Sequence, residues 1–418
     1  MTFTSYQRLV IALLAFLQFT IVLDFLILSP LGAILIQELR ITPAQFGWVV
    51  SSYAFSAGLA GLATAGFADR FDRKKLLLFF YAGFIAGTVL CGLAPSYHLL
   101  LIARIVTGLF GGVIGSISLA IAADLFPLAV RGRVMGLVQT SFAASQVLGL
   151  PLGLWLCNAW GWHAPFLMIA GIGAAVGVVI LVGLRPLTGH LQAAAALRQN
   201  PFQHLLRTAS RPDHLRTFAV TVLLATGGFM LMPFGSTFTV NNMGIDKNDL
   251  PTIYLVTGIC SIAAGPLLGR LADRVGKYAL FSAGSLLGIV MVLLLCTRGP
   301  SPLWVAIALN VPLFVSISAR MIASSALISA VPGPTERGAF MAINSSIQQF
   351  SGGLAAAIAG LIVVQGADGR LERYDVLGVV VALAMLATVV LMRGIHVLIR
   401  DRRAAASAPA VVAAVAAP

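Results

Sequence analysis

The chain has 418 residues, of which 59% are hydrophobic and only 10% are charged. A soluble domain carries roughly 25% charged residues, so this composition excludes a soluble globular protein and indicates an integral membrane protein. The net charge of +13 does not indicate nucleic-acid binding, because the basic residues lie between apolar segments and not in a basic soluble domain.

Twelve apolar segments reach the length of about 20 residues that a membrane helix needs. They lack the alternating pattern of a membrane β-barrel and lie at 9–36, 44–67, 75–94, 97–123, 134–157, 163–184, 215–240, 251–270, 278–297, 302–331, 339–365 and 376–399. We therefore predict an all-α protein with twelve transmembrane helices in two bundles of six. The predicted bundles are 1–184 and 215–400, joined by a cytoplasmic linker at 185–214 and followed by a disordered cytoplasmic tail at 401–418.

The basic residues are distributed unevenly about these segments. One side carries 20 of the 27 Lys and Arg residues and the other carries five, while Arg104 and Arg320 lie inside segments. The positive-inside rule then places both termini in the cytoplasm. The first segment is too long for a signal peptide, and a small-residue cleavage site does not follow it. We predict a multi-pass protein of the cell (inner or plasma) membrane, with the lipid bilayer as its surroundings.

Asp24 is the only charged residue among the 29 that separate Arg8 from Glu38, and it lies one residue from the midpoint of that run. A charge at the bilayer centre costs roughly 2.5–3.5 kcal/mol on insertion scales, so a group kept there usually has a function. A carboxylate can avoid this cost by binding a proton. We predict that Asp24 carries the coupling proton of a transport cycle that needs no other cofactor.

The two halves of the chain resemble each other in two places. Aligning Asp69 with Asp273 gives an offset of 204 residues, and aligning Arg-Gly at 131–132 with Arg-Gly at 337–338 gives 206. Two independent matches at nearly one offset indicate duplicated, pseudo-symmetric halves. Paired repeats around a central site are an architecture of transporters.

The loop after the second segment resembles the signature Gly-x-x-x-Asp-Arg-x-Gly-Arg-Lys of the major facilitator superfamily. Ala65 and Asp72 replace its two glycines, which the second copy keeps. The resemblance covers about residues 5–400 and implies the major facilitator fold, with a conformational latch between the halves. The alternative is that the basic residues only set the topology. The implied latch residues are Asp69, Arg70, Arg73, Lys74, Arg131, Gly269, Asp273, Arg274 and Gly276.

The fourth segment resembles the arginine motif of proton-coupled members of this superfamily. Arg104 lies about seven residues, or roughly 10 Å, from its outer end, and a guanidinium stays charged, so it needs a partner. Asp24 is the one acidic residue that we place at comparable depth. We hypothesise that Arg104 tunes proton binding at Asp24; the alternative is that it snorkels to the outer interface. Gly108 and Gly112 follow on the same segment and allow close helix contact.

The fifth segment resembles the antiporter motif of the superfamily, in which Gly-Pro is followed by paired glycines. Gly149 and Gly153 match, whereas Pro151 comes one residue late and Leu154 replaces the last glycine. The run Gly-Trp-His-Ala-Pro-Phe at 161–166 resembles the drug-exporter branch, and it is equally typical of an aromatic anchor at the membrane interface.

Polar and aromatic side chains inside the segments outline a candidate substrate cavity. Arg320 lies deep in the tenth segment, where an anionic substrate group or a backbone carbonyl can pair with it. An amide at such a position can also serve helix–helix contact. The candidate cavity residues are Gln18, Phe25, Tyr53, Gln146, Phe229, Arg320, Asn344 and Gln348.

The sequence contains no HExxH, GxSxG or Walker motif, so we predict no catalytic residues and no enzyme. Its four cysteines lack a CxxC pair, and we predict no metal ligands.

We predict a secondary active transporter that works by alternating access, as a monomer, on a small-molecule substrate. Proton-coupled efflux (antiport) of a small, partly apolar compound is the leading interpretation. Proton-coupled sugar or metabolite transport, proton-driven uptake and uncoupled facilitation remain alternatives. A lysolipid transporter is another, because Asp-Arg-Phe-Asp-Arg-Lys at 69–74 resembles a sequence of spinster-like lipid transporters. A non-transporting scaffold would gain nothing from a carboxylate at the bilayer centre.

Overall fold

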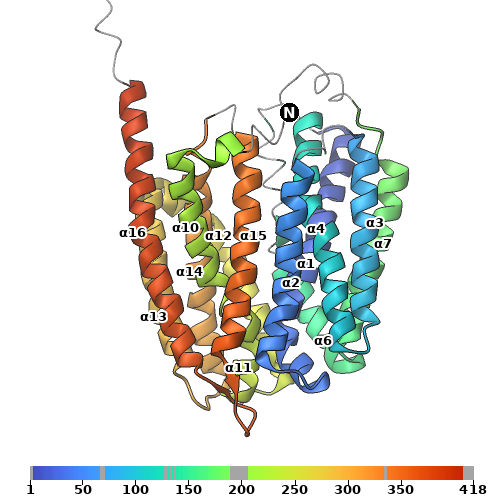
Figure 1. The fold of residues 1–418 in the computed structure, drawn as a ribbon, viewed down its shortest axis with the longest axis vertical. Helices are drawn as coiled ribbons and strands as arrows, with labels where there is room; N and C mark the ends of the chain where they lie inside the picture. Colours follow the sequence, from blue (N-terminus) through green and yellow to red (C-terminus); the bar gives the residue numbers. More distant parts are fainter. Residues whose placement is uncertain are drawn as a thin grey trace, which may run out of the picture.

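The computed structural model describes residues 3–65, 71–126, 130, 134, 137–138, 140–142, 144–188, 206–333 and 337–407. Within these ranges the protein is α-helical apart from one short hairpin, which agrees with the predicted fold class. Figure 1 shows the long helices of the first half (blue to green) gathered on one side of the molecule and those of the second half (yellow-green to red) on the other.

The helices of the first half are α1 (Ser5–Glu38), α2 (Pro43–Ala65), α3 (Arg73–Gly92), α4 (Tyr97–Leu125), the π-helical turn η2 (Ser145–Gly149), α6 (Leu150–Trp160) and α7 (His163–Gly183). Those of the second half are α10 (Pro212–Phe229), the turn η3 (Met232–Phe234), α11 (Gly235–Asn241), the turn η4 (Lys247–Asp249), α12 (Leu250–Val275), α13 (Lys277–Cys296), α14 (Leu303–Ile328), α15 (Arg337–Ile362) and α16 (Tyr374–Ser407). Strands β1 (Val364–Gln365) and β2 (Leu371–Glu372) pair antiparallel, with Val364 opposite Glu372.

Eleven candidate spans in the described residues are long and apolar enough to cross a membrane. The remaining long helix, α15, has 26 residues, about 39 Å at 1.5 Å per residue, but carries the polar Asn344 and Gln348. It packs against α2 and α10 and runs alongside α2 in the middle of Figure 1. The predicted twelfth span at α15 and the cytoplasmic position of the termini stay predictions.

Local sequence explains where several helices begin and end. A capping box between Thr4 and Gln7 starts α1. The carboxylate of Asp72 starts α3 by accepting a hydrogen bond from the Lys74 amide at 2.9 Å. Gly276 ends α12 with a φ of +93°, a conformation that favours glycine.

Two elements differ from the sequence prediction. The segment at 215–240 is not one helix: α10 ends at Phe229 and α11 begins at Gly235. Pro233 lies between them, and a proline removes a backbone donor and disturbs the preceding turn. Helix α16 continues to Ser407, seven residues into the predicted tail at 401–418, because its alanines favour helix. Residues 408–418 lie outside the described residues.

Hydrogen bonds join the two halves at the end of the molecule that carries the β1–β2 hairpin, called here the hairpin end. Ser29 of α1 donates a hydrogen bond to the carbonyl of Met232, and Ser236 donates one to the carbonyl of Ser29 at 2.7 Å. Ser29 and Met232 are 203 residues apart, and the same offset aligns Pro-x-Gly at 30–32 with Pro-x-Gly at 233–235. Equivalent positions of the two repeats therefore touch each other, as at a pseudo-symmetry axis.

Further contacts tie the halves together at the hairpin end. Gly47 of α2 and Gly360 of α15 approach so closely that a Cβ on Gly360 would lie 3.3 Å from the Cα of Gly47. Nζ of Lys247 donates a hydrogen bond to Gln37 at 2.6 Å, and the backbone carbonyl of Lys247 accepts one from Asn158 at 3.4 Å. Helices α1, α2 and α6 are thus all joined to the second half at this end.

Glycines allow α4 to pack directly on α2. A Cβ on Gly108 would lie 2.9 Å from the Cα of Tyr53, and one on Gly112 would lie 2.5 Å from the Cα of Ala57. A side chain at either position would push the helices apart, which is the usual constraint at small-residue helix contacts in membranes.

We expect Gly108→Ala to destabilise the protein relative to Gly115→Ala. Both changes add one methyl group to α4 and improve helix propensity equally, but a Cβ on Gly115 would meet no atom within 4 Å. Overpacking a tight contact typically costs about 1–3 kcal/mol. The melting temperatures of the two purified variants in detergent test this, and equal values would contradict the close α2–α4 contact.

Candidate functional site

Asp24 and Arg104 form a buried ion pair between α1 and α4. Nη1 of Arg104 lies 2.7 Å from Oδ2 of Asp24 and 3.4 Å from the carbonyl oxygen of the same residue. Asp24 is 0% exposed and Arg104 is 1% exposed. The structure therefore brings together the two residues that the sequence places at comparable depth, and the guanidinium points into the bundle.

Two further helices contribute side chains to this pair. Oγ1 of Thr88 in α3 lies 3.2 Å from Oδ1 of Asp24 and 3.0 Å from the Phe84 carbonyl, so its single proton can bond to either oxygen. The ring of Tyr53 in α2 lies under the guanidinium, with 4.5 Å from Cζ of Arg104 to the ring centroid. Sequence analysis misses Thr88, because a threonine in an apolar helix does not reveal which way it faces.

Because the pair is buried, its stability depends on whether Asp24 is charged or protonated. Two charges removed from water are stable only when their geometry is good and their remaining hydrogen-bonding groups are satisfied. Thr88 helps to satisfy the carboxylate, whereas Nε of Arg104 is buried and has no hydrogen-bond partner within the described ranges. The arrangement can therefore exist as a charged pair or as a neutral acid beside a cation.

A row of aromatic rings leads from the pair to the second half. Phe25 follows Asp24 in α1, and its ring centroid lies 5.5 Å from that of Tyr53 and 5.6 Å from that of Phe229. A Cβ on Gly352 of α15 would lie 3.0 Å from the Phe229 ring, so this ring fits against α15. Tyr53, Phe25 and Phe229, called here the aromatic cluster, are the predicted cavity residues that lie beside the pair.

The other predicted cavity residues have different surroundings. Asn344 accepts a hydrogen bond from Thr221 at 2.6 Å, so its amide joins α10 to α15. Gln18 and Gln146 are half-buried, and Gln348 is exposed.

Arg320 is only 4% exposed, with 5.7 Å from its Cζ to the ring centroid of Phe281 in α13.

The glycines of the antiporter-like motif pack on α1 next to Asp24. A Cβ on Gly149 would lie 2.6 Å from Cδ1 of Leu23, and one on Gly153 would lie 2.5 Å from Cδ1 of Ile27. Between them Pro151 lacks an N–H, and the turn before it, η2, is π-helical. Such π-helical turns occur frequently at functional sites, and the sequence does not predict this one.

The first copy of the signature loop is described only in part, since Asp69, Arg70 and Arg131 lie outside the described residues. Arg73 lies with Nε 3.4 Å from Oδ2 of Asp124, and Lys74 donates to the carbonyl of Leu181 at 2.8 Å. Both contacts lie within the first half.

In the second copy of the loop, Gly269 lies in the last two turns of α12, and Asp273 and Arg274 are exposed in the last turn before Gly276.

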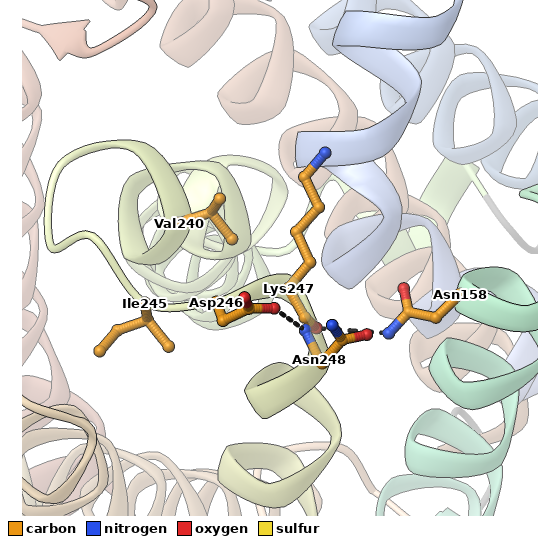
Figure 2. A pocket seen from close by; sticks show the side chains of 6 residues that line it. All are labelled: Asn158, Val240, Ile245, Asp246, Lys247 and Asn248. Atoms are coloured by element: carbon orange, nitrogen blue, oxygen red, sulfur yellow. Dashed lines mark hydrogen bonds between the residues drawn. The ribbon is translucent and has the colours of Figure 1, made fainter.

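A cavity of about 450 Å³ opens at the hairpin end. Figure 2 shows Asn158 of α6 reaching toward the backbone of Lys247, while Asp246 accepts a hydrogen bond from the Asn248 amide at 2.8 Å. Its lining contains none of the predicted cavity residues, and we assign it to the junction between the halves. The residues around it are Asn158, Val240, Ile245, Asp246, Lys247 and Asn248.

No group of three His, Cys, Asp or Glu side chains in the described ranges could hold a metal ion.

The sequence model of the Major Facilitator Superfamily matches residues 14–356 and, in a second match, 217–416. The chain belongs to the major facilitator superfamily. The uncharacterized MFS-type transporter YceJ of Bacillus subtilis (strain 168) is 28% identical over 273 residues, which are 64% of this chain and 68% of that protein.

Solved structures of superfamily members share the fold. A bacterial homologue of the human lysosomal transporter Spinster, in an inward-facing and unoccupied conformation, matches with a TM-score of 0.70 at 17% identity over 95% of this chain and 97% of that chain. The nucleoside transporter NupG matches with a TM-score of 0.71 at 13% identity over 93% and 99%. The protein is therefore a multi-pass membrane transporter with an alternating-access fold.

We expect strong energetic coupling between Asp24 and Arg104. Arg104→Gln leaves a buried carboxylate and Asp24→Asn leaves a buried guanidinium, and breaking a buried pair typically costs about 3–5 kcal/mol. Each single variant should lower the melting temperature of the purified transporter, and the double variant should lower it by less than the sum of the two.

The exposed pair of Arg370 and Asp368, whose side chains are 55% and 61% exposed, provides a matched control. Arg370→Gln and Asp368→Asn should show almost no coupling, because surface ion pairs contribute little. Additive effects at Asp24 and Arg104 would rule out the pair as a stabilising unit.

Proposed function

We propose that this superfamily member couples transport to proton movement through Asp24. The observation that carries the proposal is the isolation of the ion pair: Asp24 is 0% exposed and its Oδ2 has Nη1 of Arg104 at 2.7 Å. A carboxylate shielded from water can bind a proton in place of staying charged. Ionisable groups inside membranes usually mark ion or proton pathways. The proton would be the coupling ion, without a further cofactor.

A proton on Asp24 would change what holds α1 to its neighbours. The charged pair attracts α4 to α1, and protonation removes that Coulomb attraction. Phe25, the next residue of α1, touches Phe229 of the second half. A shift of α1 would therefore reach the interface between the halves and bias which side of the transporter is open.

For the substrate, we propose efflux by antiport of a small, partly apolar compound. The aromatic cluster offers apolar surface directly beside the coupling pair, where substrate and proton would compete. Gly149 and Gly153 of the antiporter-like motif support this choice, because they pack on Leu23 and Ile27 of α1, which lie just before and one turn after Asp24. Proton-coupled sugar, metabolite or lysolipid transport and uncoupled facilitation are the alternatives that the assay below separates.

We further propose that the hairpin end faces the outside of the cell. The bias of Lys and Arg toward the other end supports this orientation. The halves are joined at the hairpin end in this conformation, so the outer side would be closed. In the opposite state Asp69, Arg70 and Arg131, together with Arg73 and Lys74, would hold the cytoplasmic sides together.

Asp24→Asn should abolish proton-coupled transport in the protein that still folds and reconstitutes, because an amide cannot take up a proton from water. The assay reconstitutes the protein into liposomes that hold a pH-sensitive dye and adds a panel of drugs, sugars and organic anions. We expect substrate-dependent proton movement in the natural protein and background signal in the variant.

The control is Asp368→Asn, which removes an exposed carboxylate from the hairpin. Coupled flux at the natural rate in Asp24→Asn would end the assignment of Asp24 as proton carrier. Substrate flux without proton movement in the natural protein would make it a facilitator.

Gly360→Val should favour the state that is open at the hairpin end. Its Cβ would lie 2.9 Å from the Pro43 carbonyl oxygen and would separate α15 from α2. The reporter is a cysteine at Ser29, which is 9% exposed at the junction of the halves, in a Cys260→Ala background. We expect labelling by a membrane-impermeant maleimide to become several-fold faster.

Leu361→Val is the matched control, since the adjacent Leu361 is 64% exposed. Unchanged labelling in Gly360→Val would show that the close approach of α2 and α15 does not hold this end closed.

A further inference from the structure

Arg320 is a buried cation without a counter-ion in the described part of the chain. The residue is 4% exposed, and its Nε and Nη2 have no hydrogen-bond partner among the described residues. Its nearest aromatic contact is the ring of Phe281, which compensates a charge only weakly. An uncompensated charge is costly in any protein interior and more so within a membrane. A stable arrangement therefore calls for an acceptor that the described residues do not supply.

The internal repeat indicates which group is missing. The offset of 203 residues that aligns Pro30 with Pro233 also aligns Asp24 with Gly227. A Cβ on Gly227 would lie 3.8 Å from Nη2 and 3.9 Å from Nη1 of Arg320. The second half thus has an arginine beside the position where the first half has Asp24, but it lacks the carboxylate.

Arg320 reaches this position from a different turn of its helix than Arg104 does. The offset of 206 residues places the equivalent of Arg104 at Asn310, which is ten residues before Arg320 in α14. The likeness between the two arginines is therefore one of position in space and not of alignment.

Ser285 adds a second unpaired group to the same region. Ser285 is 0% exposed, and its hydroxyl has no hydrogen-bond partner in the part of the chain that the structure describes. Ser285 shares one face of α13 with Phe281 and Gly288, four residues before it and three after it. Phe281 lies against Arg320, and a Cβ on Gly288 would lie 2.9 Å from Oγ of Ser316 in α14. Nε and Nη2 of Arg320 and Oγ of Ser285 can all donate hydrogen bonds, so together they suit an anion.

The vacant side-chain position at Gly227 lies next to exposed backbone and to the aromatic cluster. Gly228 is exposed, and a Cβ there would meet no atom within 4 Å. Phe229, one residue further, touches Phe25. We propose that an anionic group of the transported compound, a carboxylate or sulfonate, takes the place of the missing side chain at Gly227 and pairs with Arg320. This inference rests on the proposed transport function and specifies its substrate class as small, partly apolar organic anions.

The first test supplies the carboxylate from the chain itself. The Cβ of Gly227→Asp would meet only ordinary van der Waals contacts, because its nearest atom would be Cγ of Met385 at 3.6 Å. Gly227→Asn adds the same volume without the charge and is the matched control. We expect a higher melting temperature for Gly227→Asp than for Gly227→Asn, and no such difference when Arg320 is replaced by Met.

The second test uses matched anionic and neutral probes on the full-length protein in detergent. Benzoate should raise the melting temperature where benzamide does not, and benzenesulfonate should do so where benzenesulfonamide does not. In Arg320→Met and in Gly227→Asp the half-saturating benzoate concentration should rise at least about tenfold. Asp368→Asn, which removes an exposed carboxylate far from both arginines' surroundings, should keep the benzoate effect. Because this measurement in detergent needs no proton movement, a failure of proton coupling and a failure of this subsite give different results.

Three outcomes would overturn the proposal. The anion subsite is wrong if Gly227→Asp is no more stable than Gly227→Asn, or if the benzoate effect survives in Arg320→Met. The third outcome comes from a chloride titration of the same protein. If chloride stabilises the protein through Arg320 and benzoate adds nothing, the site holds a free inorganic anion and the assignment to substrate is wrong.

Discussion

The contact between Asp24 and Arg104 is the interaction on which the first half of the transporter depends. A bilayer cannot solvate either charge, so each side chain needs the other within hydrogen-bond distance. This requirement fixes α1 relative to α4, and Thr88 and Tyr53 add α3 and α2 to the same point. Four helices therefore converge on one carboxylate, and the charge state of that carboxylate affects all four.

Such convergence is possible only because the helices approach closely. Gly108 and Gly112 remove the side chains that would separate α4 from α2, and the ring of Tyr53 can then reach the guanidinium of Arg104. Gly149 does the same on the opposite side of α1, where it meets Leu23. Lipid offers no hydrophobic driving force between helices, so close packing and buried polar contacts carry much of the association. The glycines thus have an electrostatic consequence as well as a steric one.

Position along the chain was enough to predict much of this arrangement, because the place of a lone charge within an apolar segment gives its depth in the membrane. Asp24 and Arg104 could be paired on that basis. Rotation about the helix axis cannot be read in the same way, so the sequence does not predict that Thr88 faces Asp24 or that Asn344 bonds to Thr221. Pro233 was visible in the sequence, but whether a proline bends a helix or divides it depends on its neighbours in space.

The two halves balance their buried arginines in different ways. Arg104 has a carboxylate from its own chain, and under the proposed coupling a proton on Asp24 would change that balance. Arg320 has none among the described residues, and a ligand anion can supply one. The contact of Phe25 with Phe229 joins the two regions, since Phe25 follows Asp24 and Phe229 lies two residues from Gly227.

Coupling between two such sites is a free energy, and it acts equally in both directions. An anion that repositions α10 at Gly227 would alter proton binding at Asp24, and proton binding would alter anion affinity by the same factor. If the two events oppose each other, the transporter exchanges substrate for protons; if they favour each other, it carries both together. Antiport and symport thus differ in the sign of one interaction, which explains why the same pair of charged sites is compatible with either direction of transport.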